Sequence, residues 1–169
     1  MHKFKAAILE KLNSPLAIKE ISCEGPSLGQ VFVKVLSSGL CGAQLQEIAG
    51  LKGNANFLPH LLGHEGCGIV EEIGQGVTKV KVGDKVVMHW KKADGFEASF
   101  PTYWDGDTKV GGGKITTLSE YALVSENRLT AVPTDTNPEF AALLGCSLTT
   151  ALGLIDNESN LRFGERVAV

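Results

Sequence analysis

The sequence predicts a mainly β domain with short helices, an α+β fold built on a β-barrel or a sandwich. Several short segments carry the alternating apolar and polar side chains of β-strands. Glycine, proline, asparagine and aspartate separate these segments, as expected for tight turns. The long helical pattern is confined to the last part of the chain, so strands and helices do not alternate as βαβ units require.

Residues 30–38 are the clearest predicted strand. Val31 and Val33 face one side, whereas Phe32 and Lys34 face the other. The same reasoning predicts strands at residues 4–9, 16–21, 30–38, 68–73, 85–88, 117–124 and 128–132. Between residues 88 and 114 no regular period is visible, and a loop of this length is usually functional or mobile.

Helical patterns occur at two places. A short one covers residues 43–49 and is closed by Gly50. A longer one runs from 138 to 155, where Asn137 can cap the first turn and Pro138 suits the first helical position. Gly145 and Gly153 fall inside that pattern as interruptions. Residues 166–169 then begin another apolar segment, which we expect to be a strand.

Composition excludes several classes of function. The chain has 169 residues, 43% of them hydrophobic, with a formal charge of −3, which fits one compact domain or a domain plus a fragment. Its 16 basic residues are scattered rather than gathered in a stripe, so no nucleic-acid partner is predicted. The start lacks the apolar run of a signal peptide, and no stretch reaches the roughly 18 apolar residues that a membrane span needs. We therefore expect a cytoplasmic protein with no membrane partner.

Four cysteines are spread along the chain, at 23, 41, 67 and 146. They form no paired framework, so they are interpreted as free thiols that can bind metal. Cys41, His64 and Cys146 each stand next to a glycine, where the backbone can bend to aim a side chain. A catalytic zinc uses three such donors and keeps one position open. Spacing alone does not establish this site, because single Cys and His residues are more often packed in a core.

A family resemblance strengthens the metal interpretation. The run Gly63-His64-Glu65-Gly66-Cys67-Gly68, with Gly74 and Val77 after it, resembles the zinc signature of the medium-chain alcohol dehydrogenases. Other segments resemble the same family in the same order: Ser38-Gly39-Leu40-Cys41-Gly42, Val82-Gly83-Asp84-Lys85-Val86, Ser119-Glu120-Tyr121-Ala122 and Gly145-Cys146-Ser147-Leu148-Thr149-Thr150-Ala151. The resemblance extends over essentially the whole chain.

The resemblance implies a GroES-like β-barrel catalytic domain of an NAD(P)-dependent oxidoreductase. Cys41, His64 and Cys146 would hold a single catalytic zinc, with Glu65 as a near neighbour and alternate ligand. Zinc would polarise an alcohol or carbonyl substrate for hydride transfer to or from a nicotinamide. Trp90 would line the substrate cleft, although an ordinary packed aromatic explains it equally well.

Three residues after Cys41 depart from the family pattern. Ala43 replaces the hydroxyl that usually passes on the alcohol proton, and Gln46 stands in place of a relay histidine. Gln44 replaces a carboxylate that would orient the ligands, and losing such support commonly weakens metal binding or activity about 10–100-fold. Glu47 and Glu65 are the candidate substitutes for moving the proton.

Many members of the family hold a second, structural zinc with four closely spaced cysteines. The corresponding stretch here, residues 88–114, contains no cysteine, so no structural zinc is predicted. Its aromatic residues either replace that metal by packing or line an interface.

The resemblance also predicts how the chain is divided. Residues 1–156 would be the GroES-like catalytic domain, and residues 157–169 a linker and the first strand of a dinucleotide-binding domain. The Gly111–Gly113 run does not supply a dinucleotide motif, because it precedes a strand rather than a helix. We therefore expect NAD or NADP to bind only a full-length form, and this chain alone to be inactive. Surface normally covered by further parts favours self-association into a homo-oligomer.

Two other functions compete with a dehydrogenase of alcohols, aldehydes or sugar-like polyols. One is a metal-binding or interaction module that has kept the barrel and lost catalysis, which the changes at Ala43, Gln44 and Gln46 favour. The other is a zinc-free relative of the quinone-reductase type. The retained Cys41, His64 and Cys146 argue against that last alternative.

Overall fold

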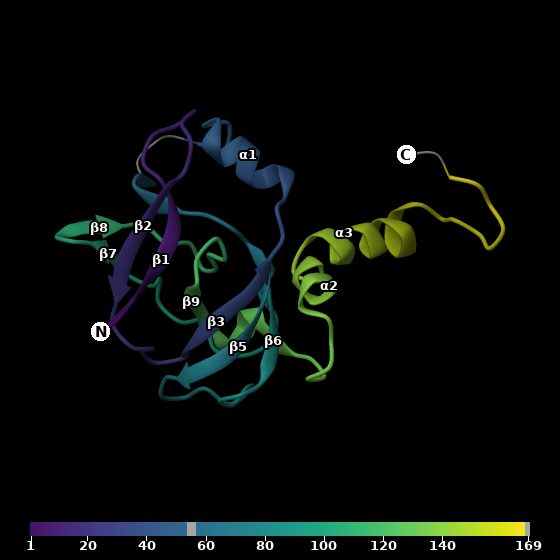
Figure 1. Ribbon diagram of the computed structural model, residues 1–169. Coiled ribbons are helices and arrows are strands. Elements are labelled where there is room, and N and C mark those ends of the chain that lie inside the picture. The colour runs from purple at the N-terminus through teal and green to yellow at the C-terminus, as the bar shows by residue number, and fades with distance from the viewer. Residues whose placement is uncertain (54–56, 168–169) are drawn as a thin grey trace.

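Two curled five-stranded sheets make up most of the computed structural model, which describes residues 1–53 and 57–167 (Figure 1). The first has the order β4-β1-β2-β7-β8 and the second the order β10-β6-β5-β3-β9. Neighbouring strands pair antiparallel in every ladder of the described residues. The expected mainly β architecture is thus confirmed.

Of the ten strands in the described residues, seven lie where the sequence predicts a strand, whereas β4, β7 and β8 were not predicted. The first sheet comprises β1 (His2–Leu9), β2 (Ala17–Cys23), β4 (His60–Leu61), β7 (Tyr103–Asp105) and β8 (Thr108–Val110). The second comprises β3 (Gln30–Ser38), β5 (Glu65–Ile73), β6 (Lys85–His89), β9 (Tyr121–Ser125) and β10 (Leu129–Ala131). The β7–β8 hairpin lies inside the stretch in which no regular period was found.

Strand β3 contributes to two adjoining hydrophobic cores. Phe32 belongs to the core that also contains Phe4 and Tyr103. Val31 and Val33, on the opposite face, belong to the core that contains Met88 and other residues. Side chains alternate along a strand, so a strand with both faces covered carries apolar residues at consecutive positions. Burying each of these side chains stabilises the fold by roughly 1.5–3 kcal/mol.

The segment just before β9 links the two sheets. Ala7 donates its backbone N–H to the Leu118 carbonyl at 2.9 Å, and Glu120 donates to the Lys5 carbonyl at 2.9 Å. The carbonyl of Glu120 in turn accepts from Val35 of β3 at 2.9 Å. Residues 117–120 were expected to be part of the strand, and they act instead as this bridge between β1 and β3.

The helices are short, and of them α2 packs against the second sheet. They are α1 (Gly42–Ile48), α2 (Pro138–Leu143) and α3 (Ser147–Gly153), with the single turns η2 (Glu126–Arg128) and η3 (Leu154–Glu158). Asn137 caps α2 by accepting the N–H of Phe140 at 2.9 Å, as predicted. Ala141 and Ala142 of α2 pack against Cys67 and Val87. Helix α3 buries none of its residues.

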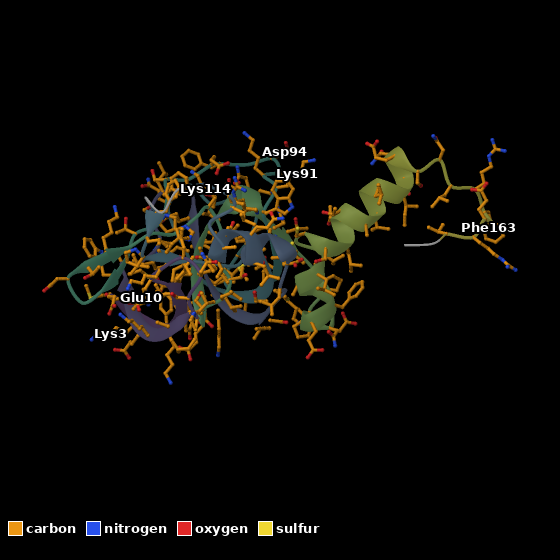
Figure 2. All side chains as sticks on the ribbon, turned by 90° about the horizontal axis from the view of Figure 1, so that it is seen from above. Lys3, Glu10, Lys91, Asp94, Lys114 and Phe163 are labelled. Atoms are coloured by element: carbon orange, nitrogen blue, oxygen red, sulfur yellow. The ribbon has the colours of Figure 1, made fainter. Side chains whose placement is uncertain are left out.

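The chain after α3 projects away from the sheets (Figure 1). Phe163 stands in this projecting segment, fully exposed to solvent (Figure 2). Arg166 and Val167, expected to start a strand, are irregular, and the rest of that expected strand lies outside the described residues. Within the described residues, no helix combines the length and the apolar character that crossing a bilayer requires.

Candidate metal centre

Three side chains from distant segments meet at the end of the second sheet where β3 ends and β5 begins. One potential ligand atom from each of Cys41, His64 and Cys146 lies within 4.8 Å of the other two. All three residues are half-buried, so the cluster is not sealed inside a core. The fold thus brings together the three residues that the sequence analysis selected as metal ligands.

Local structure places the first two ligands. Cys41 is the N-cap of α1, with extended backbone angles (φ −106°, ψ 148°). His64 immediately precedes β5, after Gly63, whose φ of +96° lies in the left-handed region. A Cβ on Gly63 would stand 2.4 Å from the Thr117 hydroxyl oxygen, so this position needs glycine for both its angle and its space.

The break between α2 and α3 places the third ligand. Cys146 has non-helical backbone angles (φ −150°, ψ −62°) and caps α3. A Cβ on Gly145 would come within 2.3 Å of the Met88 carbonyl oxygen, so the absence of a side chain lets this turn lie directly on β6. The predicted long helix is therefore divided at the ligand, and the interruption at Gly145 has a packing cause.

Glu65 lies fully buried beside the cluster but is not one of the three clustered residues. Its carboxylate accepts the backbone N–H of Ser147 at 2.9 Å and the Ser147 hydroxyl at 2.9 and 3.0 Å. Because Ser147 follows Cys146, these bonds hold the turn that carries the third ligand. Its role as an alternate ligand remains a prediction.

The backbone of Glu65 is also held by side chains that the sequence analysis did not select. Its carbonyl accepts from the Thr117 hydroxyl at 3.1 Å and from the Ser38 hydroxyl at 3.3 Å. The two hydroxyl oxygens are themselves 2.8 Å apart. Ser and Thr in these positions carry no distinctive sequence signal, because their role depends on contacts between distant segments.

Gln44 contacts two of the three clustered residues although it replaces the family's carboxylate. It is 4% exposed, its Oε1 accepts the Cys41 backbone N–H at 2.9 Å, and its Nε2 contacts Nδ1 of His64. Ala43 and Gln46 make no such contact in the described hydrogen bonds, and Gln46 is exposed.

Burial affects the protonation of two of the clustered residues. It lowers the pKa of His64, although the charges of Glu65 and Glu47 oppose the effect, and thereby favours the neutral ring. Burial and the neighbouring Cys41 raise the pKa of Cys146. A neutral imidazole is the form that binds metals, whereas a thiol must release its proton when a metal binds.

Trp90 follows β6 and adjoins the cluster through its backbone. Its N–H donates to the Gly145 carbonyl at 3.4 Å, and its carbonyl accepts from the Arg128 guanidinium. The indole is 49% exposed, so it lies on the surface near the third ligand rather than in a core. Its contact with substrate remains a prediction.

Charged side chains, more than aromatic packing, hold the loop after Trp90. Glu126 is 3% exposed and accepts backbone N–H groups of Thr78, Lys79 and Phe96. Glu97 pairs with Lys114 at 3.4 Å and with Arg128 at 3.2 Å. Of the loop's aromatic residues, Tyr103 is fully buried, whereas Phe96 and Phe100 are exposed.

A cavity of about 670 Å³ lies between α1, the segment after it and the Gly111–Gly113 run. Leucines, Phe57 and Val110 make it largely apolar, and Glu47 and His60 supply polar groups. The three clustered residues do not line it. Glu47 connects the two regions electrostatically, because its charge acts to raise the pKa of both His60 and His64 against the larger effect of burial.

The donors at the cluster fit Zn²⁺. Two cysteine sulfurs and one imidazole nitrogen are among its preferred protein ligands, and three is the number of protein ligands that catalytic zinc sites use. Carboxylate-preferring ions such as Mg²⁺ and Ca²⁺ do not suit this donor set.

Curated relatives match the chain over almost all of its residues. The S-(hydroxymethyl)glutathione dehydrogenase of Synechocystis sp. is 32% identical over 99% of the chain, and that of Escherichia coli is 33% identical over the same share. The match covers 52% of each relative, so the chain spans about half the length of these proteins.

Solved structures give the same result for the fold. An alcohol dehydrogenase zinc-binding domain protein from Burkholderia ambifaria superposes with a TM-score of 0.83 at 25% identity, over 92% of this chain and 49% of that one. Benzyl alcohol dehydrogenase from Acinetobacter calcoaceticus gives a TM-score of 0.77 at 26% identity, over 92% and 48%. Residues 27–134 match the family model for the alcohol dehydrogenase GroES-like domain. With its curled sheets and clustered Cys-His-Cys donors, the chain belongs to the alcohol dehydrogenase GroES-like domain family.

Proposed function

We propose that this chain is the zinc-binding catalytic domain of an NAD(P)-dependent alcohol dehydrogenase-type oxidoreductase. The observation that carries the proposal is the convergence of Cys41, His64 and Cys146, whose ligand atoms lie within 4.8 Å of one another. Residues separated by up to about a hundred positions would not meet in this way at random, and their donor set suits zinc. The names of the curated relatives support the oxidoreductase class.

Each residue of the centre has a distinct part in this proposal. Cys41, His64 and Cys146 hold the metal, while Glu65 fixes the Cys146 turn through Ser147. A zinc ion bound there supplies a Lewis acid that polarises an alcohol or carbonyl. Trp90, whose backbone N–H donates to the Gly145 carbonyl beside Cys146, limits the width of the substrate that can approach.

The proton of the substrate needs a route other than the family's relay. Ala43 has no hydroxyl and Gln46 cannot titrate near neutral pH. Glu65 has both carboxylate oxygens engaged by Ser147, whereas Glu47 is close enough for its charge to act on His64. Glu47 is therefore the better of the two candidate proton acceptors.

Hydride transfer belongs to the longer protein. Curated relatives are about twice the length of this chain, and we assign NAD or NADP binding to the part that the chain does not match. We expect a small-molecule alcohol or carbonyl as substrate and no turnover by residues 1–169 alone.

Metal analysis tests the site directly. Protein purified without chelator should contain about one zinc per chain. His64→Gln should remove it, because a three-ligand site loses a direct bond. His2→Gln is the matched control, since His2 lies outside the cluster and pairs with Glu72 instead. Zinc-free wild-type protein that takes up no added zinc would reject the metal site.

Activity tests the enzyme class separately. The reading frame that contains this chain, expressed in full, should reduce NAD or NADP with an alcohol and lose that activity in His64→Gln. Zinc binding without turnover across primary alcohols, polyols and aldehydes would favour the alternative, a non-catalytic metal-binding module. The exchanges at Ala43 and Gln46 are the observation behind that alternative.

A further inference from the structure

Gln44 contacts two of the three clustered residues of the metal centre with a single side chain. Its side chain is 4% exposed and reaches two of the three clustered residues at once, through opposite ends of its amide. Oε1 accepts the backbone N–H of Cys41 at 2.9 Å, and Nε2 contacts Nδ1 of His64. The same amide therefore fixes the backbone of one ligand and the ring of another.

The chemistry of these groups fixes the orientation of the amide. A backbone N–H can only donate, so the Gln44 atom beside Cys41 N must be the oxygen. The other end of the amide is then the NH₂ group, which also can only donate. It faces Nδ1 of His64, so that nitrogen must accept. A neutral ring whose Nδ1 accepts carries its proton on Nε2.

This arrangement opposes the one that a bound metal requires. Gln44 occupies Nδ1, which leaves Nε2 as the nitrogen that is free to bind a metal. A histidine that binds through Nε2 carries its proton on Nδ1, and it usually donates that proton to a carboxylate or a carbonyl. In this chain the Nδ1 proton would meet an NH₂ group, and two donors repel each other.

We propose that Gln44 is a positioning residue that holds His64 in the tautomer protonated on Nε2, and thereby sets the metal affinity of the centre below what a carboxylate at the same position would give. Metal binding then requires the amide to turn, so that Oε1 accepts from His64 and the bond to the Cys41 N–H is weakened. A carboxylate has acceptors on both oxygens and serves the Cys41 N–H and the His64 N–H together. This inference rests on the proposed metal site.

Gln44→Glu is the variant that tests the affinity, because it keeps the shape of the side chain and turns the NH₂ donor into an acceptor. Gln46→Glu is the matched control: it adds the same charge to the same helix, on an exposed side chain. Zinc and Co²⁺ affinities of the three proteins are measured by competition with a chelating dye. We expect Gln44→Glu to bind about 10–100-fold more tightly than wild type, and Gln46→Glu to bind within about 3-fold of it.

A second measurement needs no metal. In metal-free protein labelled with ¹⁵N, two-bond ¹H–¹⁵N correlations identify which ring nitrogen of His64 carries the proton, and His64→Gln assigns the signals. We expect the Nε2 proton in wild type and Gln46→Glu, and the Nδ1 proton in Gln44→Glu. Thermal unfolding of each variant checks that the fold is retained.

Two results would overturn the inference: an Nδ1 proton on His64 in metal-free wild type, or equal zinc affinity of Gln44→Glu and Gln46→Glu. If Gln44→Glu did not fold, the position of the ring proton on His64 in the metal-free wild type would still test the inference. Failure of all three folded proteins to bind zinc would reject the metal site itself, and the affinity argument with it. By contrast, folded proteins that all bind zinc with the same affinity would reject only the role of Gln44 and leave the metal site standing.

Discussion

The Glu65 carboxylate and Ser147 are joined through both the backbone and the side chain of Ser147, across 82 positions of sequence. The N–H of Ser147 donates at 2.9 Å, and its hydroxyl reaches both carboxylate oxygens, at 2.9 and 3.0 Å. Since Ser147 follows Cys146 and Glu65 follows His64, this contact ties together the segments that carry two of the three proposed ligands.

Removing the Ser147 hydroxyl should loosen that connection. Ser147→Ala leaves the buried carboxylate with one donor fewer, so we expect the free energy of unfolding to fall by about 1–3 kcal/mol. Urea denaturation followed by circular dichroism measures it. The control is Ser159→Ala, an exposed serine whose hydroxyl bonds only to residues close in sequence, Ile155 and Leu161, in the described hydrogen bonds; the expected change is below about 0.5 kcal/mol. Equal effects of the two substitutions would contradict the role of the Glu65 contact.

Gly63 should tolerate no side chain. Gly63→Ala combines the left-handed φ of +96° with a Cβ that would lie 2.4 Å from the Thr117 hydroxyl oxygen and 2.8 Å from the Leu118 nitrogen. Gly83→Ala separates the two costs, because Gly83 has a φ of +90° and open space around its Cβ position. We expect a loss of about 1–2 kcal/mol for Gly83→Ala and clearly more for Gly63→Ala. Similar midpoints of denaturation for both variants would show that crowding at Gly63 costs no stability beyond that of the left-handed φ.

Glu126 should make stability depend on pH in the acid range. Burial acts to raise its pKa, but the N–H groups of Thr78, Phe96 and Lys79 outweigh this and lower it. A carboxyl whose pKa is depressed by folding contributes stability above its ordinary pKa, and this contribution is lost as the pH falls below that value and through the lower pKa of the folded state.

The variant Glu126→Gln tests this dependence. Its free energy of unfolding should be about 2 kcal/mol lower than that of wild type at pH 7. This difference, the stability gap, should narrow below about pH 4.5. Denaturation curves at pH 7, 5 and 3.5 measure the gap. Glu158→Gln, an exposed exchange of the same kind, controls for the change in net charge. A gap independent of pH would exclude the charged carboxylate as its source.

Native cysteines should fall into two reactivity classes. Cys23 and Cys67 are fully buried, and burial raises the pKa of both thiols, that of Cys23 to about 11. Cys41 and Cys146 are half-buried, so a maleimide reagent should modify these two first in metal-free protein. Added zinc should slow their modification and leave the other two unchanged. Peptide mass spectrometry identifies the labelled sites, and early labelling of Cys23 would contradict the assignment.

Most strands could be predicted because their signals are local. Residues 30–38 coincide with β3, since alternation and flanking turns mark both of its ends. The β7–β8 hairpin was missed, because its strands are only three residues long, too short to show an alternating pattern. Its turn, Gly106-Asp107, is a recognised two-residue hairpin signal that an inspection of turns alone could have found.

The site could be predicted only in part, for a related reason. Cys41, His64 and Cys146 were found through their family motifs, and the structure brings them together. Ser147 and Thr117 were not selected, because a hydroxyl that supports a buried Glu65 looks in sequence like any other serine or threonine. The sequence identified Gln44 as a departure, whereas the two contacts of its amide depend on how α1 meets the His64 turn.

The bridge at residues 118–120 also has a consequence for biosynthesis. β1 and β3 acquire their last backbone partners only from this bridge and from β9, which ends at Ser125. A nascent chain emerging from the ribosome must therefore keep two incompletely paired strand edges apart until residues 118–125 have been made. Unpaired edges promote association between chains, so we expect ribosome-associated chaperones to raise the soluble yield. Chains arrested before residue 118 should depend on such chaperones the most.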